Sequence, residues 1–290
     1  MPRMTRVAVA GEAGIEIAVH ELGAARSSSS RTDLLLVHAA GLHGHVWLPF
    51  VERLPERFRA LAVDVRGHGE SGPLPEGGLG WEELAADLLA VVDGLDLHRP
   101  LAVGHSSGAS LLLLGEEQRS GTFAGLCCIE PIGSAVHNPP PPNPAHPLAE
   151  GARRRRDVFP SLQAAFDTYA AKPPFSSVAP QALWAYLEHG FSELAEGEGG
   201  VRLRCRPEDE AGMYTHGLSH HAYRDLDRVR CPVVLMRGDR STVVSADVLR
   251  AWAARLPDAR IEVLPGLGHF APLEDPAAVA HTVAAAFAGE

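Results

Sequence analysis

The stretch Leu101-Ala102-Val103-Gly104-His105-Ser106-Ser107-Gly108-Ala109 decides the fold of this chain. A short apolar run leads directly into the pattern G-x-S-x-G, and a helical pattern follows from there to about residue 117. A serine between a strand and a helix lies on a sharp turn with strained dihedrals, which presents its oxygen above the sheet. The two arms of such a turn nearly touch, so the residues two before and two after the serine have to be small. Gly104 and Gly108 meet that need only for Ser106, which we therefore predict to be a nucleophile.

Short apolar runs alternate with helical patterns on both sides of this turn. That alternation predicts a mostly parallel sheet that is covered by helices on both faces. The first two strands are expected to form a hairpin over residues 11–14. We expect strands near residues 7–10, 15–22, 34–37, 60–65, 101–103, 126–129, 232–236 and 261–264, and helices near 81–97, 109–117, 246–256 and 276–287.

The alternation is interrupted once, between the predicted strands at 126–129 and 232–236. Residues 138–147 contain six prolines, which cannot join a central strand and favour an extended connection. From residue 153 to about 228 the sequence favours helices and has no strong strand. We therefore expect a sheet core made of residues 1–132 and 229–290, and a helical cap inserted at 133–228.

The composition indicates which partners and compartments to expect. A formal net charge of −10 disfavours nucleic acid and anionic membranes as partners. The N-terminal residues lack the apolar stretch of a signal peptide, and no run is long and apolar enough to span a bilayer. Cys127, Cys128, Cys205 and Cys231 form no C-x-x-C pair, which indicates buried thiols. We expect a cytoplasmic protein whose partner is a small molecule.

A histidine late in the chain is the candidate general base. His269 lies in Gly266-Leu267-Gly268-His269-Phe270, directly after the last predicted strand. The flanking glycines allow this loop to fold over the sheet edge and bring an imidazole to the serine. Histidine is suited to accept a hydroxyl proton because its ordinary pKa lies near neutrality.

Four landmarks, in this order, resemble the α/β-hydrolase family along nearly the whole chain: His38-Ala39-Ala40-Gly41, the stretch from Asp64 to Gly72, the Ser106 turn, and Gly268-His269-Phe270. The resemblance implies an eight-stranded, mostly parallel sheet with helices on both faces and an inserted helical cap. It also places the catalytic histidine at His269.

Two backbone N–H groups are candidates for an oxyanion hole. Ser107 opens the helix after the nucleophile, where the positive end of the helix dipole favours a developing negative charge. The resemblance implies Ala40 as the second donor, from the loop after the third strand. The alternative for residues 38–41 is a tight turn without a chemical role.

The carboxylate behind the histidine is where this chain departs from the family. The family usually has G-x-x-D after its seventh strand, whereas this chain has Ser241 three residues after Gly238. Some members carry the acid after the sixth strand, and Glu130 occupies that place. Asp239 is the alternative, although it also suits a turn residue bonded to nearby backbone. A serine–histidine dyad or an unrecognised acid is the third possibility.

The predicted cap would roof Ser106 and shape a substrate pocket. Residues 153–156 are four consecutive arginines, which suit either a solvated helix face or an anionic substrate. Most aromatic residues of the cap are expected to form its own core, and some to line the pocket. Those considered are Phe159, Phe166, Tyr169, Phe175, Trp184, Tyr186, Phe191, Tyr214 and Tyr223.

Together these residues predict a serine hydrolase that cleaves a small-molecule ester, thioester or lactone. Ser106 would attack the carbonyl, His269 would move the protons, and water would clear an acyl-enzyme. No cofactor or metal is expected, because His43 and His45 have no matching carboxylate cluster. The alternatives are a C–C bond hydrolase or an acyltransferase with the same triad, and a non-catalytic ligand-binding protein of this fold.

Overall fold

The computed structural model describes residues 3–9, 14–23, 31–75, 80–135, 138–195, 197 and 199–288. Its main sheet has eight strands in the order β1-β2-β4-β3-β5-β6-β10-β11. The six strands from β4 to β11 in this order run parallel to one another, whereas β2 pairs antiparallel with both β1 and β4. The predicted mostly parallel, eight-stranded sheet is confirmed. The bounds are β1 (Arg3–Ala8), β2 (Glu16–Leu22), β3 (Thr32–Val37), β4 (Phe58–Val63), β5 (Leu101–His105), β6 (Gly125–Ile129), β10 (Val233–Gly238) and β11 (Ala259–Leu264).

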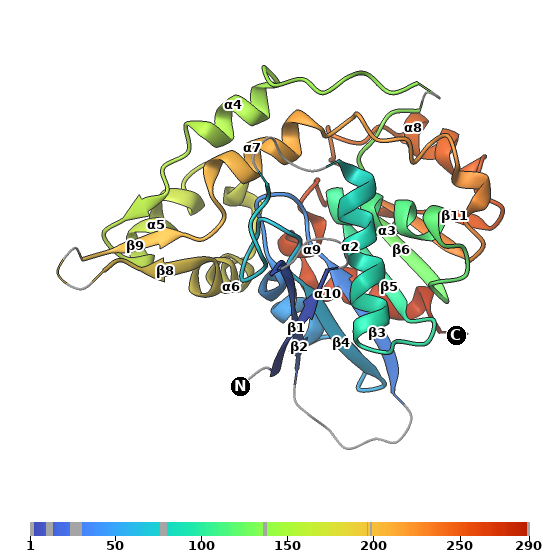
Figure 1. The fold of residues 1–290 in the computed structure, drawn as a ribbon, viewed down its shortest axis with the longest axis horizontal. Helices are drawn as coiled ribbons and strands as arrows, with labels where there is room; N and C mark the ends of the chain where they lie inside the picture. The colour runs from blue at the N-terminus through green and yellow to red at the C-terminus, as the bar shows by residue number, and fades with distance from the viewer. Residues whose placement is uncertain are drawn as a thin grey trace.

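Helices cover both faces of this sheet, as predicted (Figure 1). Successive residues of β3 point to opposite faces, as strand geometry requires. Leu35 and Val37 pack into one apolar core, and Leu34 and Leu36 pack into the other. The first core is closed by α2 (Trp81–Gly94), α3 (Ser107–Gln118) and α8 (Ala246–Ala253), and the second by α1 (Leu48–Val51) and α10 (Pro276–Ala286).

Side chains at the helix starts fix where the last two long helices begin. The Ser245 hydroxyl accepts a hydrogen bond from the Val248 N–H at 3.2 Å, and α8 starts at the next residue. The Asp275 carboxylate accepts from the Ala278 N–H at 2.9 Å, and α10 starts with a proline. Each cap satisfies one of the backbone donors that a helix leaves free at its start.

The chain between β6 and β10 forms a separate layer at one side of the sheet, at the upper left in Figure 1. The sequence favoured helices here and showed no strong strand, and the segment in fact also contains a small three-stranded antiparallel sheet in the order β7-β9-β8. These strands are only two or three residues long, too short for an alternating apolar pattern. Its elements are α4 (Pro147–Arg153), β7 (Val158–Phe159), α5 (Leu162–Ala170), η2 (Phe175–Ser177), α6 (Pro180–Gly190), β8 (Phe191–Glu193), β9 (Val201–Leu203), α7 (Pro207–Thr215) and η3 (Leu226–Arg228).

The two ends of this segment meet at one backbone carbonyl. The oxygen of Ile132 accepts a hydrogen bond from the Ser110 hydroxyl of α3 at 2.5 Å. It also accepts from Nε2 of His220 at 2.9 Å. Gly133, at φ 155°, lies so close that a Cβ there would be 2.6 Å from the His220 ring. The start of the segment, its end and the sheet core are therefore joined at Ile132.

The four cysteines are buried and free of disulfides. Among the described helices, none has the length and apolar character needed to cross a membrane. Two further short helices complete the architecture, η1 (Gly44–Trp47) after β3 and α9 (Ala271–Glu274) after β11.

Candidate active site

Ser106 lies on the sharp turn between β5 and α3. Its backbone dihedrals are φ 53° and ψ −116°, which non-glycine residues rarely adopt. A Cβ at Gly104 would lie 2.5 Å from the Cα of Ala109, and one at Gly108 would lie 2.6 Å from the carbonyl oxygen of His38. No side chain fits at either position, so the two glycines make the turn possible.

A chain of hydrogen bonds joins the three residues singled out from the sequence. The Oγ of Ser106 lies 3.1 Å from Nε2 of His269. On the other side of the ring, Nδ1 lies 2.9 Å from Oε2 of Glu130. A carboxylate accepts, so Nδ1 carries the proton and Nε2 is left as the acceptor for the serine hydroxyl. This is the arrangement in which an imidazole can remove a proton from a nucleophile.

Glu130 follows β6 and is completely buried. Its Oε1 accepts a hydrogen bond from the Gly238 N–H at 2.8 Å, and its Oε2 accepts from the Ser241 hydroxyl at 2.6 Å in addition to His269. A buried carboxylate is costly unless donors replace the water that it loses, and here three donors do so. The backbone at Glu130 has φ 53°, so its orientation also depends on an uncommon conformation.

Ser241 is the residue whose role the sequence did not reveal. It occupies the place where the family usually has an aspartate, but here its hydroxyl donates to the acid supplied by the neighbouring strand. That strand, β6, pairs in register with β10, with Ile129 opposite Met236. The position of Ser241 was the sequence signal for this role. A polar side chain three residues after Gly238 faces the buried space into which the Glu130 side chain extends.

Asp239, the alternative acid, has a different partner. Its Oδ1 accepts from the Gly266 N–H at 2.8 Å, and this bond closes the turn after β11. The side chain is exposed, and no hydrogen bond joins it to His269 in the described part of the chain. The structure therefore places Asp239 as a turn residue.

The loop that carries His269 rests directly on the end of β10. A Cβ at Gly238 would lie 2.6 Å from the carbonyl carbon of Leu267, so only glycine lets the loop approach this closely. The His105 ring, from the nucleophile turn, donates to the His269 carbonyl oxygen at 2.7 Å. Burial lowers the pKa of His105 to about 3, with a smaller contribution from the nearby His269, so His105 is a neutral support for the loop.

The predicted oxyanion loop after β3 is held by two buried imidazoles. The Gly41 N–H donates to Nε2 of His68 at 3.0 Å, and the Val65 N–H donates to Nε2 of His38 at 2.9 Å. Burial lowers the pKa of both rings, that of His38 to about 3, so both stay neutral and able to accept. This fixes the backbone around Ala40.

The two candidate oxyanion donors remain available. Ala40 lies after β3, and Ser107 is the first residue of α3. Across the residues that the structure describes, neither backbone N–H has a protein acceptor. Each can therefore donate to an oxygen of a bound molecule.

The other histidines near the site have structural partners. The His43 ring donates to the Tyr186 carbonyl oxygen at 2.9 Å, and the rings of His45 and His189 stack with centroids 3.9 Å apart. Asp64 accepts from His20 and from the Gly44 N–H. Within the described ranges, no group of three His, Cys, Asp or Glu side chains is placed to hold a metal ion.

A cavity of about 490 Å³ adjoins the site. Ala40 and Gly41 line it from the oxyanion loop, and Phe270, next to His269, lines it from the histidine loop. Of the nine aromatic residues considered above, four line the cavity: Phe159, Tyr169, Phe175 and Tyr214. Phe166 and Trp184 instead stack on each other, with centroids 4.8 Å apart.

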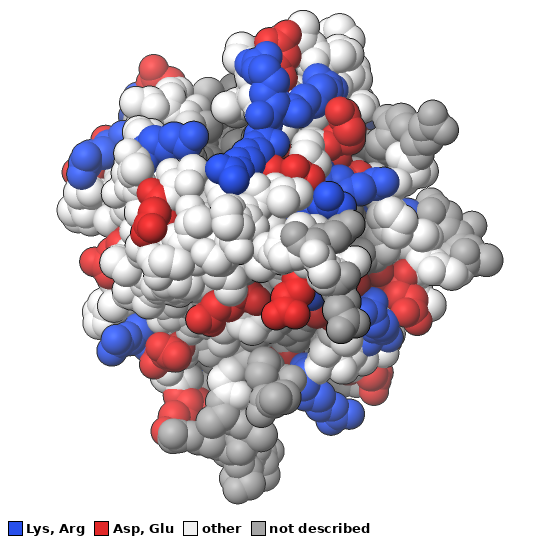
Figure 2. Space-filling view, turned by 90° about the vertical axis from the view of Figure 1, so that its left-hand side faces the viewer, with Lys and Arg blue, Asp and Glu red and all other residues white. Residues whose placement is uncertain are grey.

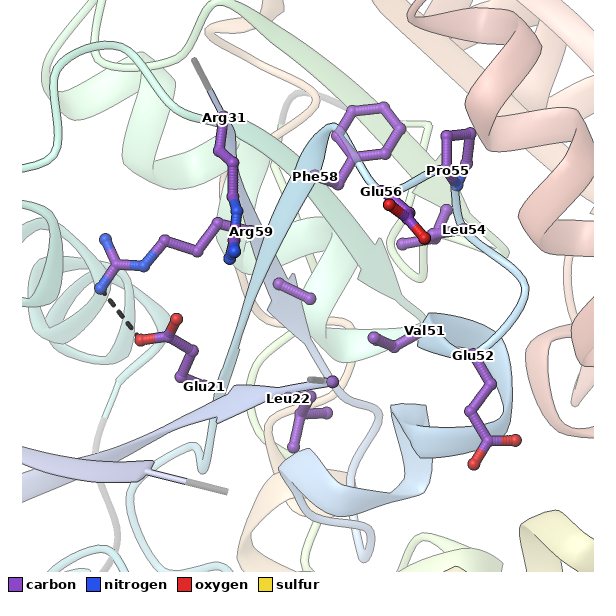
Figure 3. A pocket seen from close by; sticks show the side chains of 12 residues that line it. Glu21, Leu22, Arg31, Val51, Glu52, Leu54, Pro55, Glu56, Phe58 and Arg59 are labelled. Atoms are coloured by element: carbon purple, nitrogen blue, oxygen red, sulfur yellow. Dashed lines mark hydrogen bonds and ion pairs between the residues drawn. The ribbon is translucent and has the colours of Figure 1, made fainter. Parts of the chain in front are cut away.

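A second cavity, of about 350 Å³, lies at the opposite end of the strands (Figure 3). Phe58, at the start of β4, and Leu22, at the end of the antiparallel β2, contribute to its wall. Arg59 and Glu21 also line it and form an ion pair of 3.2 Å, which Figure 3 marks with a dashed line. Ser106 and His269 line neither cavity, but this one also lacks residues of the oxyanion and histidine loops, and ligands of parallel α/β sheets bind at the carboxyl ends of the strands.

Comparisons with known proteins show which proteins this chain is similar to. The 2-(acetamidomethylene)succinate hydrolase of Mesorhizobium japonicum is 27% identical over 252 residues, covering 84% of each chain. The pimeloyl-[acyl-carrier protein] methyl ester esterase of Chromobacterium violaceum is 26% identical over 240 residues, 82% of this chain and 87% of that protein. A crystal structure of E-2-(acetamidomethylene)succinate hydrolase superposes with a TM-score of 0.79 at 23% identity, covering 98% of both chains.

These relatives are hydrolases, and the solved structure has the same fold over almost its whole length. The sequence pattern of the alpha/beta hydrolase family matches residues 34–282, which include every strand from β4 to β11. The chain belongs to the alpha/beta hydrolase family.

Proposed function

We propose that this protein is a serine hydrolase that cleaves a carboxylic ester of a small molecule through an acyl-enzyme on Ser106. The observation that carries the proposal is the continuous hydrogen-bonded chain from Ser106 through His269 to Glu130. A serine becomes a nucleophile when a neighbouring base takes its proton, and a carboxylate behind that base stabilises the resulting imidazolium.

The geometry supports a two-stage reaction. Ser106 Oγ attacks the carbonyl carbon while its proton moves to Nε2 of His269, and the N–H groups of Ala40 and Ser107 stabilise the oxyanion. The tetrahedral intermediate collapses, and the leaving alcohol takes the proton from His269. A water molecule then attacks the acyl-enzyme with the same base, which releases the acid and restores Ser106.

An ester is the substrate class best supported among the possible ones. The Chromobacterium violaceum relative is a methyl ester esterase that matches most of this chain. Thioesters and lactones need the same groups, and so do a C–C bond hydrolase and an acyltransferase, but no described residue favours one of these. We also propose that residues 133–228 act as a cap, because they line most of the cavity beside the oxyanion loop.

Labelling with a fluorophosphonate tests the proposal. We expect one adduct per chain by intact mass, on Ser106, and none in Ser106→Ala. Hydrolysis of p-nitrophenyl butyrate by that variant should fall by at least about 10³-fold in kcat. Ser192→Ala, a change in β8, serves as the matched control and should label as the wild type does. A folded wild-type protein whose Ser106 stays unlabelled would favour a non-catalytic ligand-binding protein.

A further inference from the structure

The cavity beside the oxyanion loop has an excess of positive charge. Arg154, Arg155, Arg156 and Lys172 line it, against a single carboxylate, Glu210. This local excess is opposite in sign to the net charge of the chain, −10. Figure 2 looks onto the left-hand side of Figure 1, where the segment between β6 and β10 lies. Several Lys and Arg side chains gather in the upper part of this view. A charge excess of this sign favours an anionic ligand.

Arg155 is the buried member of this group, with a side chain 15% exposed. Its Nη1 donates to Glu210 at 2.6 Å, and its Nη2 donates to the Tyr186 hydroxyl at 2.7 Å. These two partners fix the plane of the guanidinium. Its Nε–H is buried and has no acceptor among the described residues. A guanidinium held in this way is a fixed positive charge, and an acceptor reaches its buried Nε only when a neighbouring side chain moves aside.

The Tyr169 hydroxyl is the second unsatisfied group. It is buried close to Arg155 and to the Tyr186 hydroxyl, and within the part of the chain that the structure describes it makes no hydrogen bond of regular geometry. Burial raises its pKa, so the hydroxyl stays protonated and can donate. Arg155 Nε and Tyr169 Oη are the two buried, unpartnered polar atoms that belong to residues lining this cavity. Native structures rarely leave such donors unpaired, which indicates a ligand acceptor.

The two donors lie close to the predicted oxyanion loop. Glu210, which binds Arg155, packs against Gly41 so tightly that a Cβ at Gly41 would be 2.8 Å from the Glu210 carboxyl carbon. The Tyr214 hydroxyl donates to the other Glu210 oxygen at 3.3 Å. Glu210 therefore links Arg155 to the backbone next to Ala40, so the positively charged side of the cavity lies near the oxyanion loop.

We propose that the substrate is an ester whose acyl chain carries a free carboxylate, bound by Arg155 Nε and Tyr169 Oη, with Lys172 at the cavity wall. The inference rests on the proposed function, since it names the substrate class of that site. A planar carboxylate has two acceptor oxygens, which match one guanidinium N–H and one hydroxyl.

A pair of chromogenic esters tests the substrate class. We expect kcat/KM for mono-p-nitrophenyl glutarate to exceed that for p-nitrophenyl valerate, which has the same number of acyl carbons but no charge. Arg155→Gln should lower this ratio by roughly 10- to 100-fold, the usual worth of a hydrogen bond to a charged group. Arg153→Gln is the matched control, because Arg153 belongs to the same arginine run but does not line the cavity.

Three outcomes of this comparison would overturn the proposal. One is a wild-type protein without preference for the charged ester, and another is an Arg155→Gln variant that loses both activities equally. The third is an equal loss of the ratio in Arg153→Gln. Should Arg155→Gln fail to fold, Lys172→Gln replaces it, because this side chain is exposed and its change spares the core. We expect a smaller loss of the ratio, roughly 3-fold, and an unchanged ratio would contradict the proposal.

A binding assay separates the anion site from catalysis. Lys172 is the only lysine in the sequence, so amine acetylation followed by peptide mapping reports on this one side chain apart from the N-terminus. In Ser106→Ala, we expect glutarate to slow acetylation of Lys172 and valeramide to leave it unchanged. Absence of protection by glutarate would overturn the anion site. Protection together with a wild-type Ser106 inert to fluorophosphonate would instead overturn the proposed hydrolase function alone.

Discussion

The ends of the neighbouring strands β6 and β10 each present an acidic side chain near His269, but the two are in opposite environments. Glu130, after β6, is completely buried and accepts from three donors, one of them the His269 ring. Asp239, after β10, is exposed and accepts from the Gly266 backbone. The family usually places its acid after β10, at the position of Ser241 in this chain, and Asp239 is the carboxylate next to that position. The carboxylate that serves His269 is the one whose side chain extends into the buried space behind the imidazole.

The largest expected difference is in kcat between two variants, each of which has one of these acids neutralised. Glu130→Gln is expected to lower kcat for p-nitrophenyl butyrate by about 10³- to 10⁴-fold, because an amide that donates to Nδ1 forces the proton onto Nε2. Asp239→Asn should change kcat by less than about 3-fold, since its bond to Gly266 is outside the hydrogen-bonded chain. Equal losses, or the reverse order, would show that the comparison is wrong.

A carboxylate placed after β10 should partly replace Glu130. In a Glu130→Gln background, Ser241→Asp is expected to recover about 10- to 100-fold in kcat, because Ser241 already reaches the acid that His269 contacts. In the presence of Glu130, the same change should lower stability, since two carboxylates would share one buried space. Kinetics and urea unfolding of the four combinations test both effects. Absence of any recovery would mean that position 241 cannot reach the imidazole.

The hydrogen bond between the two strand ends is expected to have an intermediate effect. Ser241→Ala removes the hydroxyl that donates to Glu130 at 2.6 Å. We expect kcat to fall by about 3- to 10-fold and the free energy of unfolding to fall by about 1–2 kcal/mol, because a buried carboxylate loses one of its donors. Ser241→Thr, which retains the hydroxyl, is the matched control. An unchanged kcat in Ser241→Ala would indicate that the hydroxyl does not orient Glu130.

The smallest effect concerns the turn that Asp239 closes. Asp239→Ala removes the acceptor for the Gly266 N–H and should lower the free energy of unfolding by about 0.5–1 kcal/mol, as for other exposed side chain–backbone bonds. The kcat should stay within about 2-fold of the wild type. Thermal and urea unfolding measure the first quantity, and initial rates the second. A large kcat loss without a stability loss would return Asp239 to the list of candidate acids.

Much of the fold could be predicted from the sequence because its signals are local. The glycines around Ser106 and the apolar run Leu34-Leu35-Leu36-Val37 are each a consequence of backbone geometry or burial. The sequence also indicated Glu130 as the candidate acid, because Ser241 occupies the position where the family usually has an aspartate. The structure places Glu130 within hydrogen-bonding distance of His269.

Other features depend on contacts between residues far apart in sequence. The three strands of the smaller sheet are too short for a pattern, and Val158–Phe159 is defined only by its partner β9. The role of Ser241 required the register of β6 against β10. The unpaired Nε of Arg155 could not be distinguished within a run of four arginines, because only burial separates it from its neighbours.

The junction at Ile132 has a consequence for exchanging this layer between relatives. Its carbonyl is tied both to α3 and to His220, and Glu130 lies only two residues earlier. A chimera should therefore join the two parents inside residues 134–219, so that Gly133, His220 and Trp252 come from one parent. A junction on the other side of Ile132 would separate groups that contact each other, and the disturbance would reach the carboxylate behind His269.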